Sequence, residues 1–300
     1  MTPRSCNFDD FGMATATLAG PLEARLAAIR EVGFTQVMLE AGDLAQHPGG
    51  LEAAARAVKA SGLRVTGLQW LRDFEGLSDQ QHAYKLEVAQ ALLQMAHAVG
   101  APMLMVSAST HPAAAQDLET IARDLRKLAM LAIPLGLRVA YEAVGGSRTV
   151  HDLFGAWDVV DRADMPNLGL AIDTADTVLA GVALDDLDLI DPDKILVVRL
   201  ADVFDAAGHE ADASDGTLRR RVFPGEGPRS VQVAALVLQL AGLGFRGDYS
   251  FEVFNDDYRQ LPLPTVAERA RRSAIWLAED ILRRSTPLPG QMQLRAVKEA

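Results

Sequence analysis

The chain has 300 residues, of which 40 are acidic and 29 are basic, so its formal net charge is −11. This acidic balance argues against a nucleic-acid-binding protein, which needs a basic surface to neutralise phosphates. The single cysteine, Cys6, excludes an internal disulfide framework and a cysteine-based zinc cluster. There is no run of about eighteen apolar residues and no apolar leader at the N-terminus. We therefore expect a cytoplasmic protein with no membrane span.

Helical and strand-like segments alternate along the sequence. In the first half we predict strands at 12–18, 36–39, 64–68 and 103–106, and helices at 22–32, 51–60, 78–99 and 113–135. Ser78 followed by Gln81 resembles a capping box at the start of the third of these helices. In the second half we predict strands at 137–141, 168–172, 195–200 and 249–253, and helices at 150–163, 231–243 and 265–283.

This alternation predicts parallel β-α-β units, and the short apolar strands are typical of a sheet buried on both faces. Eight such strands favour an α/β fold, a single (β/α)8 TIM barrel over 1–285, with a C-terminal tail over 286–300. A doubly wound open sheet is the alternative. It would normally carry a glycine-rich phosphate loop after its first strand, and this sequence has none, so we expect no nucleotide cofactor.

Polar side chains follow the predicted strands, at the end of a barrel where active sites lie. They are Glu40, Gln69, Ser107, Glu142, Asp173, Arg199 with Asp202, and Glu252. The carboxylates of Glu142, Asp173 and Glu252 are expected to converge on one barrel mouth, where each needs a positive partner. Carboxylate oxygens suit Mg²⁺, Mn²⁺ or similar ions. The alternative is that each carboxylate caps a helix or forms a surface ion pair.

Several short segments resemble a known family. The segments that resemble the sugar phosphate isomerase/epimerase family, a family of xylose-isomerase-like barrels, are 141–143 (YEA), 168–174 (LGLAIDT), 200–202 (LAD) and 223–227 (FPGEG). Those that resemble the barrel domain of bacterial 3-dehydroshikimate dehydratases are 69–76 (QWLRDFEG) and 251–257 (FEVFNDD). The resemblance runs from about Gly12 to about Glu279.

The resemblance implies a divalent metal (Mn²⁺, Mg²⁺, Co²⁺ or Zn²⁺) with Glu142, Asp173 and Glu252 among its ligands. The fourth ligand of the family falls on Arg199, which stays protonated and has no lone pair for a metal. An acid-base histidine of the family falls on Asp176. Two alternatives stay open: three carboxylates and waters hold the metal, or the carboxylates pair with Arg199 and other arginines.

The resemblance also implies the reaction class, an isomerase, epimerase or dehydratase that removes a proton next to a carbonyl. The expected partner is a small, anionic, polyhydroxylated carbonyl compound, with no nucleic acid and no membrane; a homodimer is an open option. The catalytic candidates are Glu142, Asp176, Arg199 and Glu252, and the substrate-binding candidates are Trp70, Arg72, Arg148 and Arg221. We interpret His151 as a surface residue. The alternative function, favoured by Arg199 and Asp176, is a degenerate barrel that binds a ligand without turnover.

Overall fold

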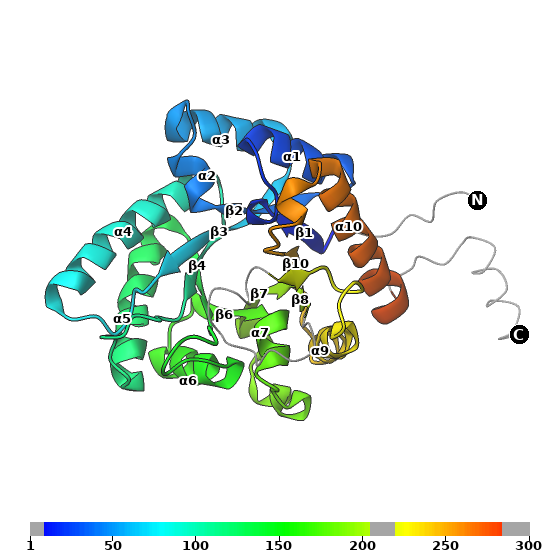
Figure 1. Ribbon diagram of the computed structural model, residues 1–300. Helices are drawn as coiled ribbons and strands as arrows, with labels where there is room; N and C mark the ends of the chain where they lie inside the picture. The colour runs from blue at the N-terminus through cyan, green and yellow to red at the C-terminus, as the bar shows by residue number, and fades with distance from the viewer. Residues whose placement is uncertain (1–8, 205–219, 284–300) are drawn as a thin grey trace, which may run out of the picture.

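Eight parallel strands form a closed barrel in the computed structural model, which describes residues 9–204 and 220–283. Around the barrel the strands follow the order β1, β10, β7, β6, β5, β4, β3, β2 (Figure 1). Their bounds are β1 Phe11–Ala14, β2 Gln36–Glu40, β3 Arg64–Arg72, β4 Met103–Ser107, β5 Arg138–Glu142, β6 Leu168–Asp173, β7 Ile195–Leu200 and β10 Asp248–Phe251. The predicted barrel is confirmed. The predicted tail, 286–300, and Cys6 lie outside the described residues.

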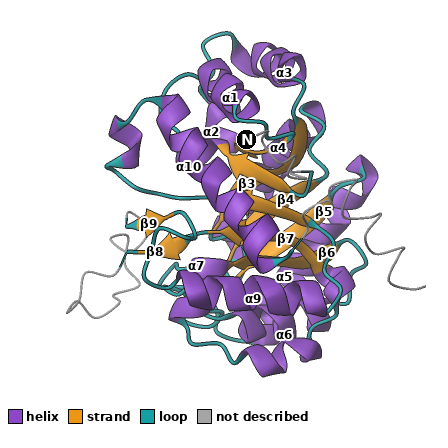
Figure 2. Ribbon diagram, turned by 90° about the vertical axis from the view of Figure 1, so that its right-hand side faces the viewer, coloured by secondary structure: helices purple, strands orange, loops and turns teal. Residues whose placement is uncertain are grey.

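Helices follow the strands and cover the outside of the barrel (Figure 2). They are α1 Leu22–Glu31, α2 Ala41–Ala45, α3 Gly50–Ser61, α4 Asp79–Ala98, α5 Leu118–Ala132, α6 Leu153–Ala163, α7 Thr174–Leu179, α9 Ser230–Gly242 and α10 Leu263–Ile275. In α5, Ile121, Leu125 and Leu128 recur at helical spacing and are buried, which fixes the face that packs on the strands. None of the helices in 9–204 and 220–283 has the length and apolarity of a membrane span.

Small and medium-sized apolar side chains fill the inside of the barrel. They form a hydrophobic cluster separate from the main core: Ala14, Met38, Met103, Met105, Ala140, Ala171, Leu196 and Val197. Side chains two positions apart on a strand share a face. Ala140 and Ala171 therefore lie on the same barrel face as Glu142 and Asp173, one layer below them. The alternation thus points these acidic side chains into the barrel mouth.

The strand registers bring the site residues next to one another. Asp173 of β6 pairs with Arg199 of β7. Ser250 of β10 also pairs with Arg199, and the N–H of Glu252 donates to the Leu200 carbonyl at 3.1 Å. Position 199 therefore lies between two carboxylates on neighbouring strands. A two-stranded hairpin beside the barrel, β8 Asp202–Val203 with β9 Arg221–Val222, was not predicted.

Two strand predictions need correction. The first strand, predicted at 12–18, ends at Ala14 and is followed by the short 3-10 helix Thr15–Thr17. The chain turns here because the Thr15 hydroxyl accepts a hydrogen bond from the Glu40 N–H at 3.0 Å. The strand predicted at 64–68 is longer than expected, since β3 continues to Arg72 and includes Gln69 and Trp70.

Three helix predictions also differ from the structure. The helix predicted from residue 113 begins at Leu118, because the Asp117 side chain caps it by accepting from the Thr120 N–H at 3.0 Å. Ser78 is the N-cap of α4, but its side chain makes no capping hydrogen bond, so the predicted capping box is wrong. The last helix, α10, ends at Ile275, where a π-helical turn, Trp276–Ile281, replaces it.

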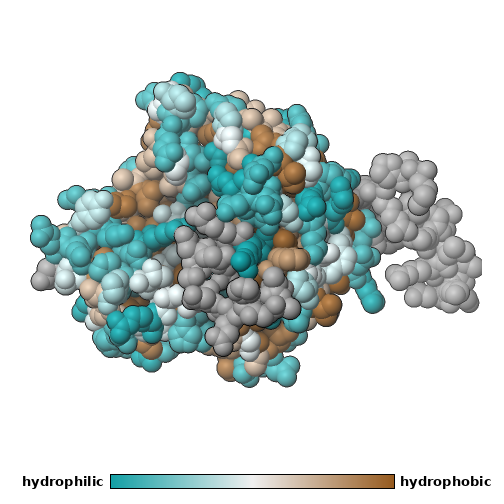
Figure 3. Space-filling model, viewed as in Figure 1, coloured by the Kyte–Doolittle hydropathy of each residue, from teal (hydrophilic) through white to brown (hydrophobic). Residues whose placement is uncertain are grey.

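The surface is mixed. In the face that Figure 3 shows, polar side chains cover most of the described part and apolar ones form separate small patches. The large exposed apolar residues lie on different elements: Tyr84, Met130, Ile133, Leu189, Phe204, Val231, Leu238 and Leu261. No single patch marks a subunit interface in the described residues, so the homodimer stays a prediction.

Candidate functional site

Arg199 lies where three carboxylates meet at the C-terminal end of the barrel. Its Nε donates to Glu252 Oε2 at 2.7 Å, and its Nη2 lies 2.6 Å from Glu252 Oε1, which makes a bidentate pair. Its Nη1 donates to Glu142 Oε1 and lies 3.5 Å from Asp173 Oδ2. All four side chains are at most 5% exposed. The structure therefore brings Glu142, Asp173 and Glu252 together as predicted, and the cation that faces them is a guanidinium.

Arg221 extends this cluster from the hairpin. Its Nη1 donates to Asp173 Oδ2, and its Nη2 donates to Asp176 Oδ1 at 2.8 Å. Asp173 is also the N-cap of α7, because its Oδ1 accepts from the Asp176 N–H at 3.0 Å. Asn255 Nδ2 donates to the Arg221 carbonyl at 3.0 Å and helps fix β9. Arg221, which we predicted as a substrate-binding residue, is therefore bound to two carboxylates of its own chain.

The charges in this cluster do not cancel, because four carboxylates face two guanidinium groups. Burial raises the pKa of Glu142 to about 7, and the neighbouring carboxylates of Asp173 and Glu252 add to the effect against the opposing pull of Arg199. Burial also raises the pKa of Asp176. For Asp173, burial is outweighed by Arg221 and Arg199, which hold its pKa below the ordinary value. The cluster thus combines a fixed positive charge with a carboxyl, Glu142, that exchanges its proton near neutral pH.

The third strand supplies one wall of the cluster. Gln69 Nε2 donates to Glu252 Oε1 at 3.1 Å. The guanidinium carbons of Arg199 and Arg72 lie 5.0 Å and 4.5 Å from the centre of the Trp70 ring. Arg72 is exposed. Trp70 and Arg72, two of the predicted substrate-binding residues, therefore border the cluster. Arg72 is a cation that faces solvent.

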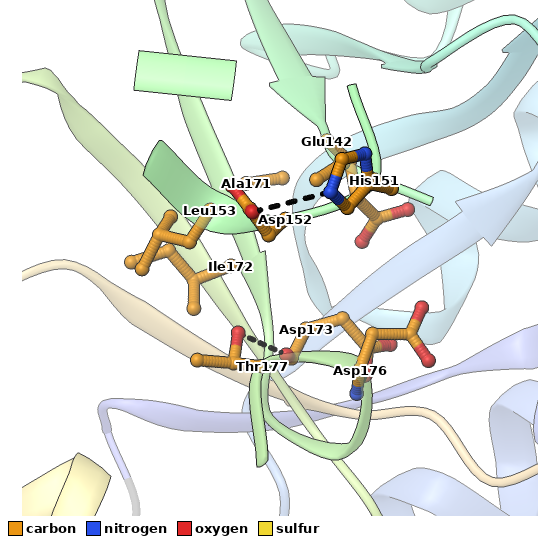
Figure 4. Close-up of a pocket in the computed structure, with 10 residues that line it drawn as sticks. Glu142, His151, Asp152, Leu153, Ala171, Ile172, Asp173, Asp176 and Thr177 are labelled. Carbon is orange, nitrogen blue, oxygen red and sulfur yellow. Dashed lines mark hydrogen bonds and ion pairs between the residues drawn. The ribbon is translucent and has the colours of Figure 1, made fainter. Parts of the chain in front are cut away.

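A pocket opens beside Glu142, Asp173 and Asp176 and is also lined by His151 and Asp152 (Figure 4). His151 Nε2 lies 3.5 Å from Asp152 Oδ2. His151 is exposed, as a surface residue should be, but it also borders this pocket. The only sequence signal for that position was its place a few residues after a strand that ends in Glu142.

Arg148 lies at a second pocket, beside Glu75, Ser109 and His111. Its Nη1 donates to the Pro112 carbonyl at 3.0 Å. The structure therefore does not bring this predicted anion contact to the Glu142 pocket.

Sequence reasoning missed Glu75, which is 1% exposed. Its Oε1 accepts from the Ser109 N–H at 2.6 Å and from the Tyr141 hydroxyl at 3.0 Å, while its buried Oε2 has no partner in the described residues. Burial raises the pKa of Glu75 to about 7, against the hydrogen bonds from Ser109 and Tyr141. The available signal was that Glu75 is a charged residue between Phe74 and Gly76, within the segment 69–76 that resembles the dehydratases.

The carboxylates, as they are placed, do not fit a divalent ion. Both oxygens of Glu252 face Arg199, and both oxygens of Asp173 already accept hydrogen bonds. A guanidinium has no lone pair for a metal and repels a second cation. Within 9–204 and 220–283 no three His, Cys, Asp or Glu side chains are arranged to hold a metal. The catalytic and metal-binding roles assigned to Glu142, Asp173 and Glu252 stay predictions.

Comparison with known proteins identifies relatives. The family model for the xylose isomerase-like TIM barrel matches residues 26–279. A 3-dehydroshikimate dehydratase of Pseudomonas aeruginosa is 34% identical over 92% of this chain and 43% of its own length. One of Neurospora crassa is 27% identical over 80% of this chain and 79% of its own length. An inosose isomerase of Bacillus subtilis is 27% identical over half of this chain. The chain thus spans less than half of the Pseudomonas relative, and all three relatives are named as enzymes.

Solved structures agree with the sequence relatives. A fusion protein of a xylose isomerase-like TIM barrel and 4-hydroxyphenylpyruvate dioxygenase matches 94% of this chain and 45% of its own chain, with a TM-score of 0.84 and 29% identity. The IOLI protein, solved with a bound zinc atom, matches 91% of this chain and 99% of its own, with a TM-score of 0.79 and 20% identity. These matches confirm the resemblance seen in the sequence. The chain belongs to the xylose isomerase-like TIM barrel family.

Proposed function

We propose that this chain is a lyase or isomerase that moves a proton next to the carbonyl of a small polyhydroxylated compound. The first candidate reaction is the dehydration of 3-dehydroshikimate, because relatives over most of the chain carry that name. The second is the isomerisation of an inosose, the activity named for relatives that match half of the chain. A cytoplasmic location and a small anionic substrate are part of the proposal.

The observation that carries the proposal is the state of Glu142. Its carboxyl is buried at the end of β5, lines the pocket, and has a pKa raised to about 7 by burial. A general base works best when its pKa lies near the working pH. In either reaction the ionised Glu142 takes the proton from the carbon next to the carbonyl, and the electron pair moves onto the carbonyl oxygen. The positive charge of Arg199, which contacts Glu142, favours that oxyanion.

The remaining residues have supporting roles in this proposal. Glu252 holds the Arg199 guanidinium in a bidentate pair. Asp176 faces the pocket and, with a pKa raised by burial, returns the proton or protonates a leaving hydroxyl. Arg72, the exposed cation beside Trp70, is the candidate contact for a substrate carboxylate. No step passes through a metal, because the two arginines already hold the carboxylates.

The test is turnover of 3-dehydroshikimate by the purified chain in deuterium oxide. Return of a solvent deuteron to the carbanion incorporates deuterium, whereas dehydration removes the hydroxyl as one water, and mass spectrometry detects either outcome. We expect kcat/KM to rise with pH up to about 7, where Glu142 becomes ionised. Glu142→Gln keeps the shape and removes the base, so kcat/KM should fall by about 100-fold or more.

The matched control is Glu52→Gln, which changes a 93% exposed carboxylate on α3 and should keep the wild-type rate. Wild-type turnover in Glu142→Gln would contradict the role of Glu142. Absence of both water loss and deuterium exchange with 3-dehydroshikimate and with inososes would contradict the proposed chemistry.

A second candidate function is ligand binding without turnover. The specific observation in its favour is that Arg199 and Arg221 already bind all four carboxylates of the cluster. In that case 3-dehydroshikimate should raise the melting temperature of the chain with neither loss of water nor deuterium incorporation. The same incubations therefore decide between the two functions.

A further inference from the structure

We propose that Arg199 is a built-in cation that takes the place of a divalent metal ion in this barrel, and that histidine at this one position opens a metal site. The inference concerns metal binding and does not depend on which reaction the chain catalyses.

The first step is the position of the guanidinium. Arg199 contacts carboxylates from three other strand ends: Glu142 ends β5, Asp173 ends β6 and Glu252 follows β10. Oxygen atoms that converge from several elements on one buried point are the arrangement that holds hard divalent cations. Here the point is filled by a side chain, because Arg199 itself starts from the neighbouring position on β7.

The second step is charge. A guanidinium keeps its proton in proteins, so Arg199 carries a fixed positive charge among Glu142, Glu252 and Asp173. A divalent ion at the same point would face this fixed positive charge across a few ångströms of poorly screened interior. Arg221 adds a second positive charge on Asp173.

The third step is the charge that remains in the cluster when a shorter, neutral side chain replaces Arg199. Without the Arg199 charge, Arg221 still pairs with Asp173 and Asp176, but Glu142 and Glu252 lose the cation that contacts them, so the cluster carries an excess of negative charge that attracts a divalent ion. Glu252 Oε2 and Glu142 Oε1, which Arg199 now holds, become free acceptors, while Glu252 Oε1 keeps the hydrogen bond from Gln69. A histidine on β7 adds a neutral imidazole nitrogen with a lone pair, a ligand type that suits Zn²⁺ and similar ions.

The experiment measures Mn²⁺ binding by electron paramagnetic resonance and melting temperature with Mn²⁺ or EDTA, on the purified full chain. For the wild type we expect no saturable site at millimolar Mn²⁺ and no shift with EDTA. For Arg199→His we expect one Mn²⁺ per chain, bound at least about tenfold more tightly than by the wild type, and a higher melting temperature with Mn²⁺. The double variant Arg199→His/Glu252→Gln should lose that gain.

Arg56→His is the matched control, because it places a histidine on the exposed face of α3 and should bind like the wild type. A wild-type chain that binds one Mn²⁺ and loses it in Glu252→Gln overturns the proposal. If Arg199→His does not fold alone, millimolar Mn²⁺ should restore its folding. A variant that stays unfolded with Mn²⁺, or folds without binding it, overturns the second half of the proposal.

Discussion

Two buried carboxyl groups, Glu142 and Glu75, have pKa values raised to about 7 by burial, but they lie in opposite surroundings. Glu142 faces a guanidinium and two other carboxylates inside the barrel mouth. Within residues 9–204 and 220–283 no cation forms an ion pair with Glu75, which is held by hydrogen bonds from the Ser109 N–H and the Tyr141 hydroxyl. Tyr141 and Glu142 are neighbours on β5, so alternation points their side chains to opposite faces of the sheet.

The difference teaches that similar proton affinities can depend on different interactions. The pKa of Glu142 is raised by burial and modified by the charges of Arg199, Asp173 and Glu252, so it should respond to any change in Arg199. The state of Glu75 is set by burial against two neutral donors, so it should respond to the loss of a hydrogen bond and ignore the arginines. A substitution that changes the surroundings of one carboxyl group should therefore leave the pKa of the other unchanged.

The largest effect is expected for Arg199→Met, which removes the central cation. Glu142 and Glu252 lose the guanidinium that pairs with them, while Asp173 keeps only Arg221, and breaking a buried ion pair in this way costs about 3–5 kcal/mol of the free energy of unfolding. The loss should be smaller at pH 5 than at pH 8, because protonated carboxyls no longer need the cation. Urea denaturation at the two pH values measures both effects.

Arg56→Met is the control for this variant, since it removes an exposed arginine and should change the free energy of unfolding by less than about 0.5 kcal/mol. An Arg199→Met chain as stable as the wild type at pH 8 would show that the cluster is not held by the guanidinium. The comparison with Glu75 predicts in addition that this variant leaves the titration of Glu75 unchanged.

The fold could be predicted from the sequence because its signals are local and repeated. Apolar runs of strand length alternate with helical patterns along the chain, and this order implies parallel β-α-β units. Eight strands and the missing glycine-rich loop then favour the closed barrel over an open sheet. The ends of elements were less predictable, since they depend on contacts across the barrel. The Thr15 hydroxyl, for example, ends the first strand by accepting from Glu40 on a neighbouring strand.

The candidate site was predictable in its carboxylates and not in their partners. Glu142, Asp173 and Glu252 follow strands, so the topology alone brings them together. The contact between Arg221 and Asp173 depends on the β8–β9 hairpin. Each strand of this hairpin has only two residues, which is too short to give a strand pattern in the sequence. Glu75 escaped notice because its burial comes from packing between distant segments, with Ser109 and Tyr141 as its partners.

The next effect in size is the pH dependence that Glu75 gives to stability. Its pKa is about 7 in the folded chain against an ordinary value of 4.5, so between these values the folded state binds more protons than the unfolded state. The free energy of unfolding therefore falls as pH rises from about 4.5 to about 7, by up to about 3 kcal/mol. Glu75→Gln cannot titrate, so it should match the wild type at pH 5 and be more stable at pH 8.

Urea denaturation of both chains from pH 5 to pH 8 gives this slope directly. The exposed Glu52→Gln should keep the wild-type slope. If Glu75→Gln loses stability equally at pH 5 and pH 8, then the amide fails to replace the carboxyl in its hydrogen bonds and Glu75 is not the group that titrates.

The smallest effect is expected for Tyr141→Phe, which removes one donor to Glu75 and keeps the ring that packs in the core. The cost should be about 1 kcal/mol at pH 5, where Glu75 is protonated, and about 2 kcal/mol at pH 8, where the lost hydrogen bond is to a charged group. Tyr84→Phe, at a 62% exposed position, is the control and should cost nothing measurable. Because Tyr141 points away from the barrel mouth, the pH at which turnover depends on Glu142 should not move. A shift there would mean that Glu75 and Glu142, which are linked through Tyr141, form a single coupled system, and the contrast between a charge-balanced and a hydrogen-bonded carboxyl would fail.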